Sequence, residues 1–140
     1  MAAAATCDAV QLFLRPPGRW AAAASPPGEA ARFRQAAGVN GVEGRCFAHA
    51  PYLLNLASTD EGLQERSRRV LVEELERAGN LGLAGVVLHP GSAGIGGNRL
   101  AAEARCREAL ASAVAEAGDG AARLLVEGAA GAGGQLGTTP

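Results

Sequence analysis

Short apolar runs alternate with longer segments of helical periodicity along this 140-residue sequence. Each apolar run is too short for a stable helix and is apolar on both faces, which is typical of strands buried in a parallel sheet. The segments between the runs carry apolar residues at the spacing of amphipathic helices. This alternation constrains the chain to a parallel sheet with right-handed crossovers. The expected strands are 8–14, 45–48, 84–88 and 122–126, and the expected helices are 29–37, 58–78 and 99–117.

The helix expected to begin at Ser58 has the strongest local signals in the chain. Ser58 and Glu61 have the spacing of a capping box, in which each side chain accepts a hydrogen bond from the other residue's backbone N–H. Gly79 is expected to end this helix, and Asn98 is expected to cap the next one. Two ion pairs are expected on its solvated face, Glu65–Arg69 and Glu73–Arg77.

Composition and charge exclude several classes of protein. Hydrophobic residues make up 48% of the chain and charged residues 19%, which is typical of a globular domain and not of a disordered chain. The 13 basic residues, all Arg, are balanced by 14 acidic ones, so the chain is no polycation. No run of about 18 apolar residues occurs, and no basic N-terminal region precedes an apolar one, so neither a membrane span nor a signal peptide is expected.

The three cysteines of the sequence bear on where the protein works. Cys7, Cys46 and Cys106 are odd in number and widely spaced, which suits buried thiols in a reducing compartment better than a disulfide framework. We therefore expect an intracellular protein, in the cytoplasm of a prokaryote or in the nucleus or an organelle of a eukaryote.

Three residues with metal-binding side chains occupy equivalent positions in the repeated pattern. His49, His89 and Glu127 each follow one of three successive expected strands, and the chain has no other histidine. Because the carboxyl ends of parallel strands lie side by side, these side chains are expected on one rim of the sheet. Two imidazoles and a carboxylate suit Zn²⁺, with a fourth position for water. A histidine after a strand is more often a hydrogen-bonded turn residue, but the shared position of all three favours a metal site.

The glycine-rich loop before the third expected helix is a weaker signal. Residues 94–98 (GIGGN) open a helix, and a helix N-terminus can hold a phosphate group. The loop lacks both the spacing of a dinucleotide-binding motif and the lysine of a P-loop. No nucleotide cofactor is therefore expected.

Several segments, in order, resemble the endonuclease IV family of apurinic/apyrimidinic (AP) endonucleases. Residues 49–56 (HAPYLLNL) resemble the family's H-x-x-Y-L-x-N-L segment, and residues 87–92 (VLHPGS) resemble its H-P-G-S segment. Residues 125–131 (LVEGAAG) resemble its I-E-N-T-A-G segment, while 10–13 and Trp20 fit its second strand and the tryptophan that follows. The similarity is collinear from about 8 to 137 and covers about half of such an enzyme.

The resemblance implies an α/β fold, a partial TIM-type (β/α) barrel of about four parallel strands alternating with three helices. The barrel domain would span 8–137, between an Ala-rich tail (1–7) and a C-terminal tail (138–140). The implied activity is that of a zinc-dependent endonuclease of base excision repair, which hydrolyses the phosphodiester 5′ to an abasic site in DNA. The family uses three Zn²⁺ ions, and the ligands of about one site are present here, namely His49, His89 and Glu127.

The resemblance also implies two contacts with DNA that contains abasic sites. Tyr52 matches the side chain that the family inserts into DNA near the flipped-out abasic nucleotide. Arg19 is adjacent to Gly18, which stands where the family has its DNA-probing arginine. Tyr52 and Trp20 are both expected on loops of the ligand-bearing rim and not in the core.

Several parts of the family pattern have no counterpart in this sequence. The sequence lacks the family's first strand, with its G-A-H-x-S segment, and everything after the family's fourth strand. Gly128 and Ala129 replace the Asn and Thr that follow the family's Glu, which Glu127 matches. The 140-residue chain is therefore expected to be an AP endonuclease by family and inactive alone. Two alternatives stay open: a metal-dependent sugar isomerase or epimerase of the same barrel superfamily, and a non-catalytic remnant.

Overall fold

The computed structural model describes residues 7–129 and 134–137, and within them four strands alternate with three helices. The sheet order is β1-β2-β3-β4 with every pair parallel, so the expected alternation and strand direction are confirmed. Most of the expected tails, residues 1–6 and 138–140, lie outside the described residues. The strands are β1 (Val10–Leu12), β2 (Cys46–His49), β3 (Gly85–Leu88) and β4 (Arg123–Val126), and the helices are α1 (Glu29–Val39), α2 (Glu61–Leu81) and α3 (Arg99–Ala117).

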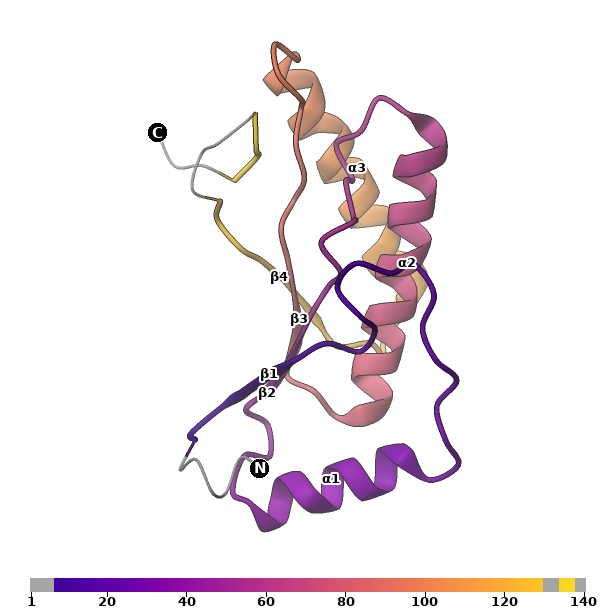
Figure 1. Ribbon diagram of the computed structural model, residues 1–140, viewed down its shortest axis with the longest axis vertical. Coiled ribbons are helices and arrows are strands. Elements are labelled where there is room, and N and C mark those ends of the chain that lie inside the picture. The colour runs from indigo at the N-terminus through magenta and orange to yellow at the C-terminus, as the bar shows by residue number, and fades with distance from the viewer. Residues whose placement is uncertain (1–6, 130–133, 138–140) are drawn as a thin grey trace.

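The helices lie beside one face of the sheet. Figure 1 shows α2 and α3 side by side next to the strands, with α1 across the lower end. The core lies between α2 and the two central strands, where Leu71 and Leu75 of α2 and Ala48, Val86 and Leu88 of the strands are fully buried. Among the described residues the sheet does not close, because β1 pairs only with β2 and β4 only with β3. The architecture is therefore that of a partial barrel.

The capping box predicted for α2 is wrong. Asp60 is the N-cap, and its side chain accepts a hydrogen bond from the Leu63 N–H at 3.0 Å. The Ser58 hydroxyl instead accepts the Asp60 N–H at 3.0 Å, which forms a turn just before the helix. Glu61 is thus the first residue of the helix, too early to complete a box with its own cap.

The end of α2 also differs from the prediction. The helix continues through Gly79 to Leu81 and ends at Gly82, which adopts the left-handed conformation with φ 76°. Gly79 has a different reason to be glycine: a Cβ atom there would lie 2.1 Å from the Gly120 carbonyl oxygen. Close packing of the next turn against the helix, and not helix termination, explains this glycine.

One of the two predicted ion pairs on α2 forms. Glu65 and Arg69 lie 3.7 Å apart, as expected. Glu73 pairs instead with Arg15 at 2.9 Å, and Arg77 pairs with Glu29 at 3.4 Å. Arg15 in the loop after β1 and Glu29 at the start of α1 are therefore partners that local spacing on α2 does not reveal.

The cap predicted for α3 is confirmed, and the expected burial of the cysteines holds for two of the three. Asn98 caps α3 by accepting the Ala101 N–H at 3.1 Å. Cys46 and Cys106 are buried free thiols, whereas Cys7 is exposed. No helix within the described ranges is long and apolar enough to cross a membrane.

Candidate metal centre

Parallel pairing brings the ends of β2, β3 and β4 to one level. His49 is the last residue of β2 and pairs in register with Val87, and His89 is the first residue after β3. The Glu127 N–H donates to the Leu88 carbonyl at 2.9 Å, which extends the ladder by one residue beyond β4. The sheet therefore fixes the backbone of all three residues at its carboxyl edge.

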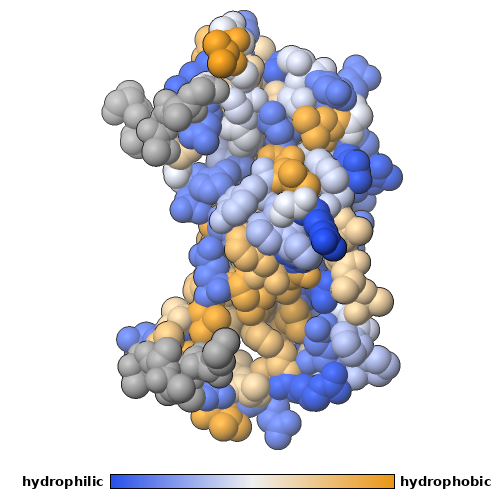
Figure 2. Space-filling model, viewed as in Figure 1, coloured by the Kyte–Doolittle hydropathy of each residue, from blue (hydrophilic) through white to orange (hydrophobic). Residues whose placement is uncertain are grey.

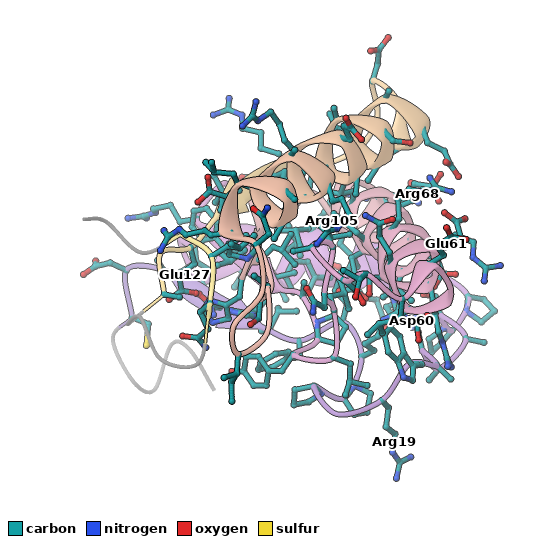
Figure 3. All side chains as sticks on the ribbon, turned by 90° about the horizontal axis from the view of Figure 1, so that it is seen from above. Arg19, Asp60, Glu61, Arg68, Arg105 and Glu127 are labelled. Atoms are coloured by element: carbon teal, nitrogen blue, oxygen red, sulfur yellow. The ribbon has the colours of Figure 1, made fainter. Side chains whose placement is uncertain are left out.

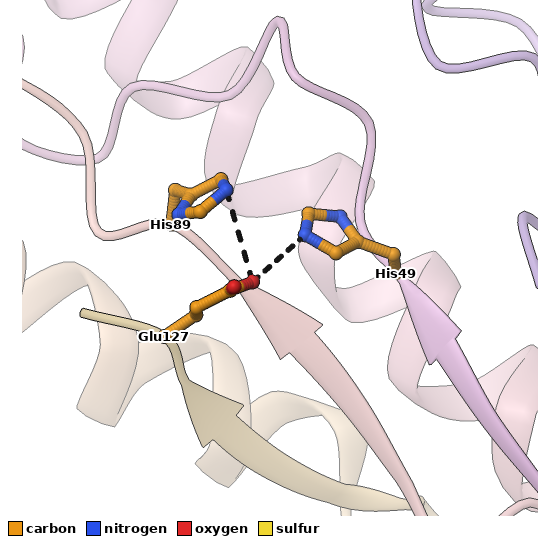
Figure 4. Close-up of side chains that lie close together, drawn as sticks. All are labelled: His49, His89 and Glu127. Carbon is orange, nitrogen blue, oxygen red and sulfur yellow. Dashed lines mark hydrogen bonds and ion pairs between the residues drawn. The ribbon is translucent and has the colours of Figure 1, made fainter. Parts of the chain in front are cut away.

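The three side chains converge at this edge. His49 Nε2 lies 3.2 Å from Glu127 Oε2, and His89 Nε2 lies 3.8 Å from the same oxygen (Figure 4). One potential ligand atom from each residue lies within 4.8 Å of the other two. The His49 side chain is 4% exposed, whereas those of His89 and Glu127 are 44% and 47% exposed. The cluster is thus closed on the side of β2 and open to solvent on the side of β3 and β4.

Hydrogen bonding fixes the direction of the His49 ring. Its Nδ1 lies 2.7 Å from the Ala50 carbonyl oxygen, and because a carbonyl only accepts, Nδ1 is the donor. In the neutral ring, Nε2 then presents a lone pair to the Glu127 carboxylate, so that two acceptors face each other. A cation between them removes this conflict, and backbone orientation of the second ring nitrogen is typical of metal-binding histidines. The donor set and its geometry therefore fit a zinc ion.

The second histidine supports the same assignment. His89 Nδ1 is buried and has no hydrogen-bond partner among the described residues, while Nε2 faces the Glu127 carboxylate. The two imidazole rings lie 5.2 Å apart between centroids, tilted by 55°. Both Nε2 atoms are thus turned toward one shared oxygen.

Aromatic side chains flank the cluster on the side of β1. The Tyr52 ring lies 5.2 Å from the His49 ring in an edge arrangement, and Phe13 lies 5.5 Å from the same histidine. Tyr52 is 64% exposed, on the connection between β2 and α2. As expected, Tyr52 lies on a loop at this rim and outside the core.

Trp20 and Arg19 are not brought to the cluster. Trp20 lies on the loop after β1, as expected, and it is partly buried where it packs against the core, with the Arg66 guanidinium 4.4 Å from its ring centroid. Arg19 is exposed, and Figure 3 shows it pointing outward, well away from Glu127.

Sequence reasoning missed a buried ion pair beneath the loop after β1. Arg15 Nε donates to Glu74 Oε1 at 2.6 Å, and both side chains are almost completely buried. Arg15 also donates to the Trp20 carbonyl and to Glu73, so it holds the loop of 13–20 on α2. The available signal was Glu74 itself, a carboxylate on the apolar face of α2 beside Leu71 and Leu75, since a buried charge requires a partner.

An open sheet of parallel strands with covering helices, and potential metal ligands at the carboxyl edge of its strands, is the architecture of part of a TIM barrel. The chain belongs to the xylose isomerase-like TIM barrel family, whose model matches residues 1–140. Relatives named as probable endonuclease 4 include those of Streptomyces avermitilis, 38% identical over 92% of this chain, and Methanoculleus marisnigri, 37% identical over 96%. The chain covers 41% and 47% of these relatives, respectively, so it spans less than half of their length. The resemblance to endonuclease IV is thereby confirmed.

Two solved structures share the fold. Endonuclease IV from Thermus thermophilus superposes with a TM-score of 0.78 at 34% identity, over 97% of this chain and 47% of that one. A D-tagatose 3-epimerase-like protein superposes with a TM-score of 0.63 at 24% identity, over 80% of this chain and 42% of that one. The second likeness establishes the fold alone.

Proposed function

We propose that this chain carries one metal-binding portion of a zinc-dependent endonuclease that hydrolyses the phosphodiester 5′ to an abasic site in DNA. The observation that carries the proposal is the convergence of His49 and His89 on Glu127, with His49 Nε2 3.2 Å from Glu127 Oε2. The barrel domain of this proposal spans 8–137. The relatives named as endonucleases support the substrate class.

The chain's own residues have distinct roles in this proposal. Nε2 of His49, Nε2 of His89 and the Glu127 carboxylate hold the zinc ion, and the Ala50 carbonyl keeps the His49 ring in the tautomer that binds metal. A zinc ion bound there supplies Lewis-acid chemistry to a phosphodiester. The site lies at the solvent-exposed rim, as access to a polymeric substrate requires.

The exposed Tyr52 ring favours DNA over a sugar as the substrate. A large aromatic side chain that is 64% exposed beside the candidate metal ligands can stack on a base or enter a gap in the duplex. Arg19, on an exposed loop, supplies a positive charge for a phosphate group. A duplex with a missing base is the easiest to open at that point, since no base stacking is lost there.

Zinc titration of the isolated chain tests the metal site. We expect about one Zn²⁺ per chain, because three ligands build a single open site. His89→Ala and Glu127→Gln are expected to weaken Zn²⁺ binding at least about tenfold, in line with the loss of a ligand or its support. Glu108→Gln, which removes an exposed carboxylate from α3, is the matched control and should bind as the parent chain does. Equal affinity in all four proteins contradicts the site.

Binding to DNA tests the substrate class separately. The zinc-loaded chain should prefer a duplex with a synthetic abasic site over the intact duplex, and Tyr52→Ala should remove that preference. Arg19→Gln should weaken binding to both duplexes alike. The dependence of affinity on salt concentration should fall by the amount expected for about one phosphate contact. Turnover of a ketose or aldose without binding of abasic DNA would favour the isomerase alternative.

A further inference from the structure

Asn55 uses both ends of its amide to join two loops of the rim. It lies on the connection between β2 and α2, and its Nδ2 donates to the Ser92 carbonyl at 3.2 Å. The Ser92 N–H donates back to Asn55 Oδ1 at 3.1 Å, across 37 residues of sequence. The side chain therefore pairs with the backbone of Ser92 as a neighbouring strand would.

The near side of this link is anchored to α2. The Asn55 N–H donates to the Ser67 hydroxyl at 3.0 Å, and Ser67 donates in turn to the Leu63 carbonyl at 2.7 Å. Ser67 is completely buried. Asn55 Oδ1 also accepts the Ala57 N–H at 3.1 Å, which fixes the amide within its own loop. The Asn55 residue is thus fixed by its own loop and by α2, independently of its bonds to Ser92.

The far side of the link continues to the segment after β4. Gly91 has a φ of 107°, and a Cβ atom there would lie 2.3 Å from Asn55 Oδ1, so the backbone approaches the amide closely. The Gly91 carbonyl accepts the Leu136 N–H at 2.9 Å, and Ser92 forms a β-bridge with Gln135. Gln135 and Leu136 therefore contact Ser92, which the Asn55 amide holds, and Gly91 beside it.

We propose that Asn55 is a positioning residue that holds the three loops at the candidate ligands in register, an inference that rests on the proposed metal site. The first loop follows His49 and carries Tyr52, the second begins with His89, and the third begins with Glu127. Asn55 acts through the backbone of Gly91 and Ser92 and contributes no ligand itself. Asparagine suits this task because it is short, planar, and both a donor and an acceptor.

Two variants and one matched control separate positioning from general stability. Asn55→Ala removes both hydrogen bonds to Ser92, and Asn55→Asp keeps the size and the acceptors but loses the donor. Gln64→Ala is the control, because Gln64 Nε2 donates to the Leu56 carbonyl at 3.0 Å in the same loop without reaching the second loop. Urea unfolding places the three variants on one scale of stability.

The first readout is binding of Co²⁺, followed by its visible absorption spectrum. We expect Asn55→Ala to bind Co²⁺ about tenfold more weakly, as is common when a residue that supports a metal site is replaced, and to show an altered spectrum at saturation. Asn55→Asp should change the affinity and the spectrum in the same direction. Gln64→Ala should keep the affinity and the spectrum of the parent chain even where it loses as much stability as the Asn55 variants. Parent-like affinity and spectrum in both Asn55 variants would overturn the inference.

The second readout needs no metal and stays informative if Co²⁺ does not bind. Amide hydrogen exchange at Leu136 should accelerate in Asn55→Ala and Asn55→Asp, and not in Gln64→Ala. Exchange at Ser92 should accelerate in Asn55→Ala, which removes the acceptor of its N–H. Failure of the parent chain to bind Co²⁺ would refute the proposed metal site. Unchanged exchange at Leu136 in both Asn55 variants would refute the link between the loops.

Discussion

Cys106 shows at the scale of one residue how burial gives the fold a pH dependence. Its thiol donates to the Pro90 carbonyl at 3.2 Å from the buried face of α3. Burial raises the pKa of Cys106 from the ordinary value of 9.0 to about 11. The folded chain therefore keeps this proton over a range of pH in which the unfolded chain has lost it.

The sign of the effect on stability follows from that difference. Between about pH 9 and 11 the folded state binds more protons, so the free energy of unfolding should fall as the pH rises, by up to roughly 3 kcal/mol. Urea unfolding of the parent chain and of Cys106→Ala across this range measures the effect. The difference in unfolding free energy between the two should shrink with rising pH, and a constant difference would contradict the prediction.

The single-residue predictions that succeeded rest on position in a repeat. His49, His89 and Glu127 could be placed together from sequence because parallel strands of successive units end at one edge, whatever the details of packing. The Arg15–Glu74 pair could not be placed, because it joins a loop to a helix far away in sequence. The link from Asn55 to Ser92 was hidden for the same reason.

At the scale of elements, the start of α2 distinguishes two competing caps. Asp60 accepts the Leu63 N–H of the first turn, whereas Ser58 accepts only the N–H of Asp60. Asp60→Ala should therefore lower the free energy of unfolding by about 1 kcal/mol, as loss of an N-cap does, and Ser58→Ala should lower it by less. Urea unfolding at pH 7 compares the two, and a larger loss for Ser58→Ala would contradict the structure.

Element types were predictable, whereas element ends were decided by neighbours. The first strand was expected over 8–14 but is paired only over Val10–Leu12, because β2 is its one partner and Arg15 turns the chain toward α2. The last turn of α2 extends past Gly79 because Leu81 is buried there. Local signals identify the elements, and tertiary packing sets where they stop.

At the scale of the whole molecule, the open sheet bears on the cleavage of DNA that is expected of residues 1–140 alone. β4 is an edge strand whose Leu125 and Val126 are 38% and 54% exposed, and Figure 2 shows an apolar area in the middle of the molecule with polar side chains at both ends. The relatives named as endonucleases are more than twice as long as the matched region. The three potential ligands among the described residues would hold one ion, whereas stabilising both reacting oxygens of a phosphodiester takes a second.

Residues 1–140 alone are therefore expected to bind zinc without cutting abasic DNA at a useful rate. A chain extended by the second half of a relative should regain incision, and His89→Ala in that longer chain should abolish most of it. Gel analysis of an end-labelled duplex with one abasic site measures both. Robust zinc-dependent incision by the 140-residue chain would contradict this prediction.

The strand order β1-β2-β3-β4 has a consequence for how the protein forms during synthesis. Each strand after β1 pairs with the strand that precedes it in the chain, so each pairing becomes possible as soon as the later strand leaves the ribosome. The crossovers from Leu12 to Cys46, from His49 to Gly85 and from Leu88 to Arg123 each contain one helix and are similar in length, so the entropic cost of closing each one is similar. The rim that gathers His49, His89 and Glu127 can thus be assembled unit by unit, with the last donor arriving when the fourth strand docks.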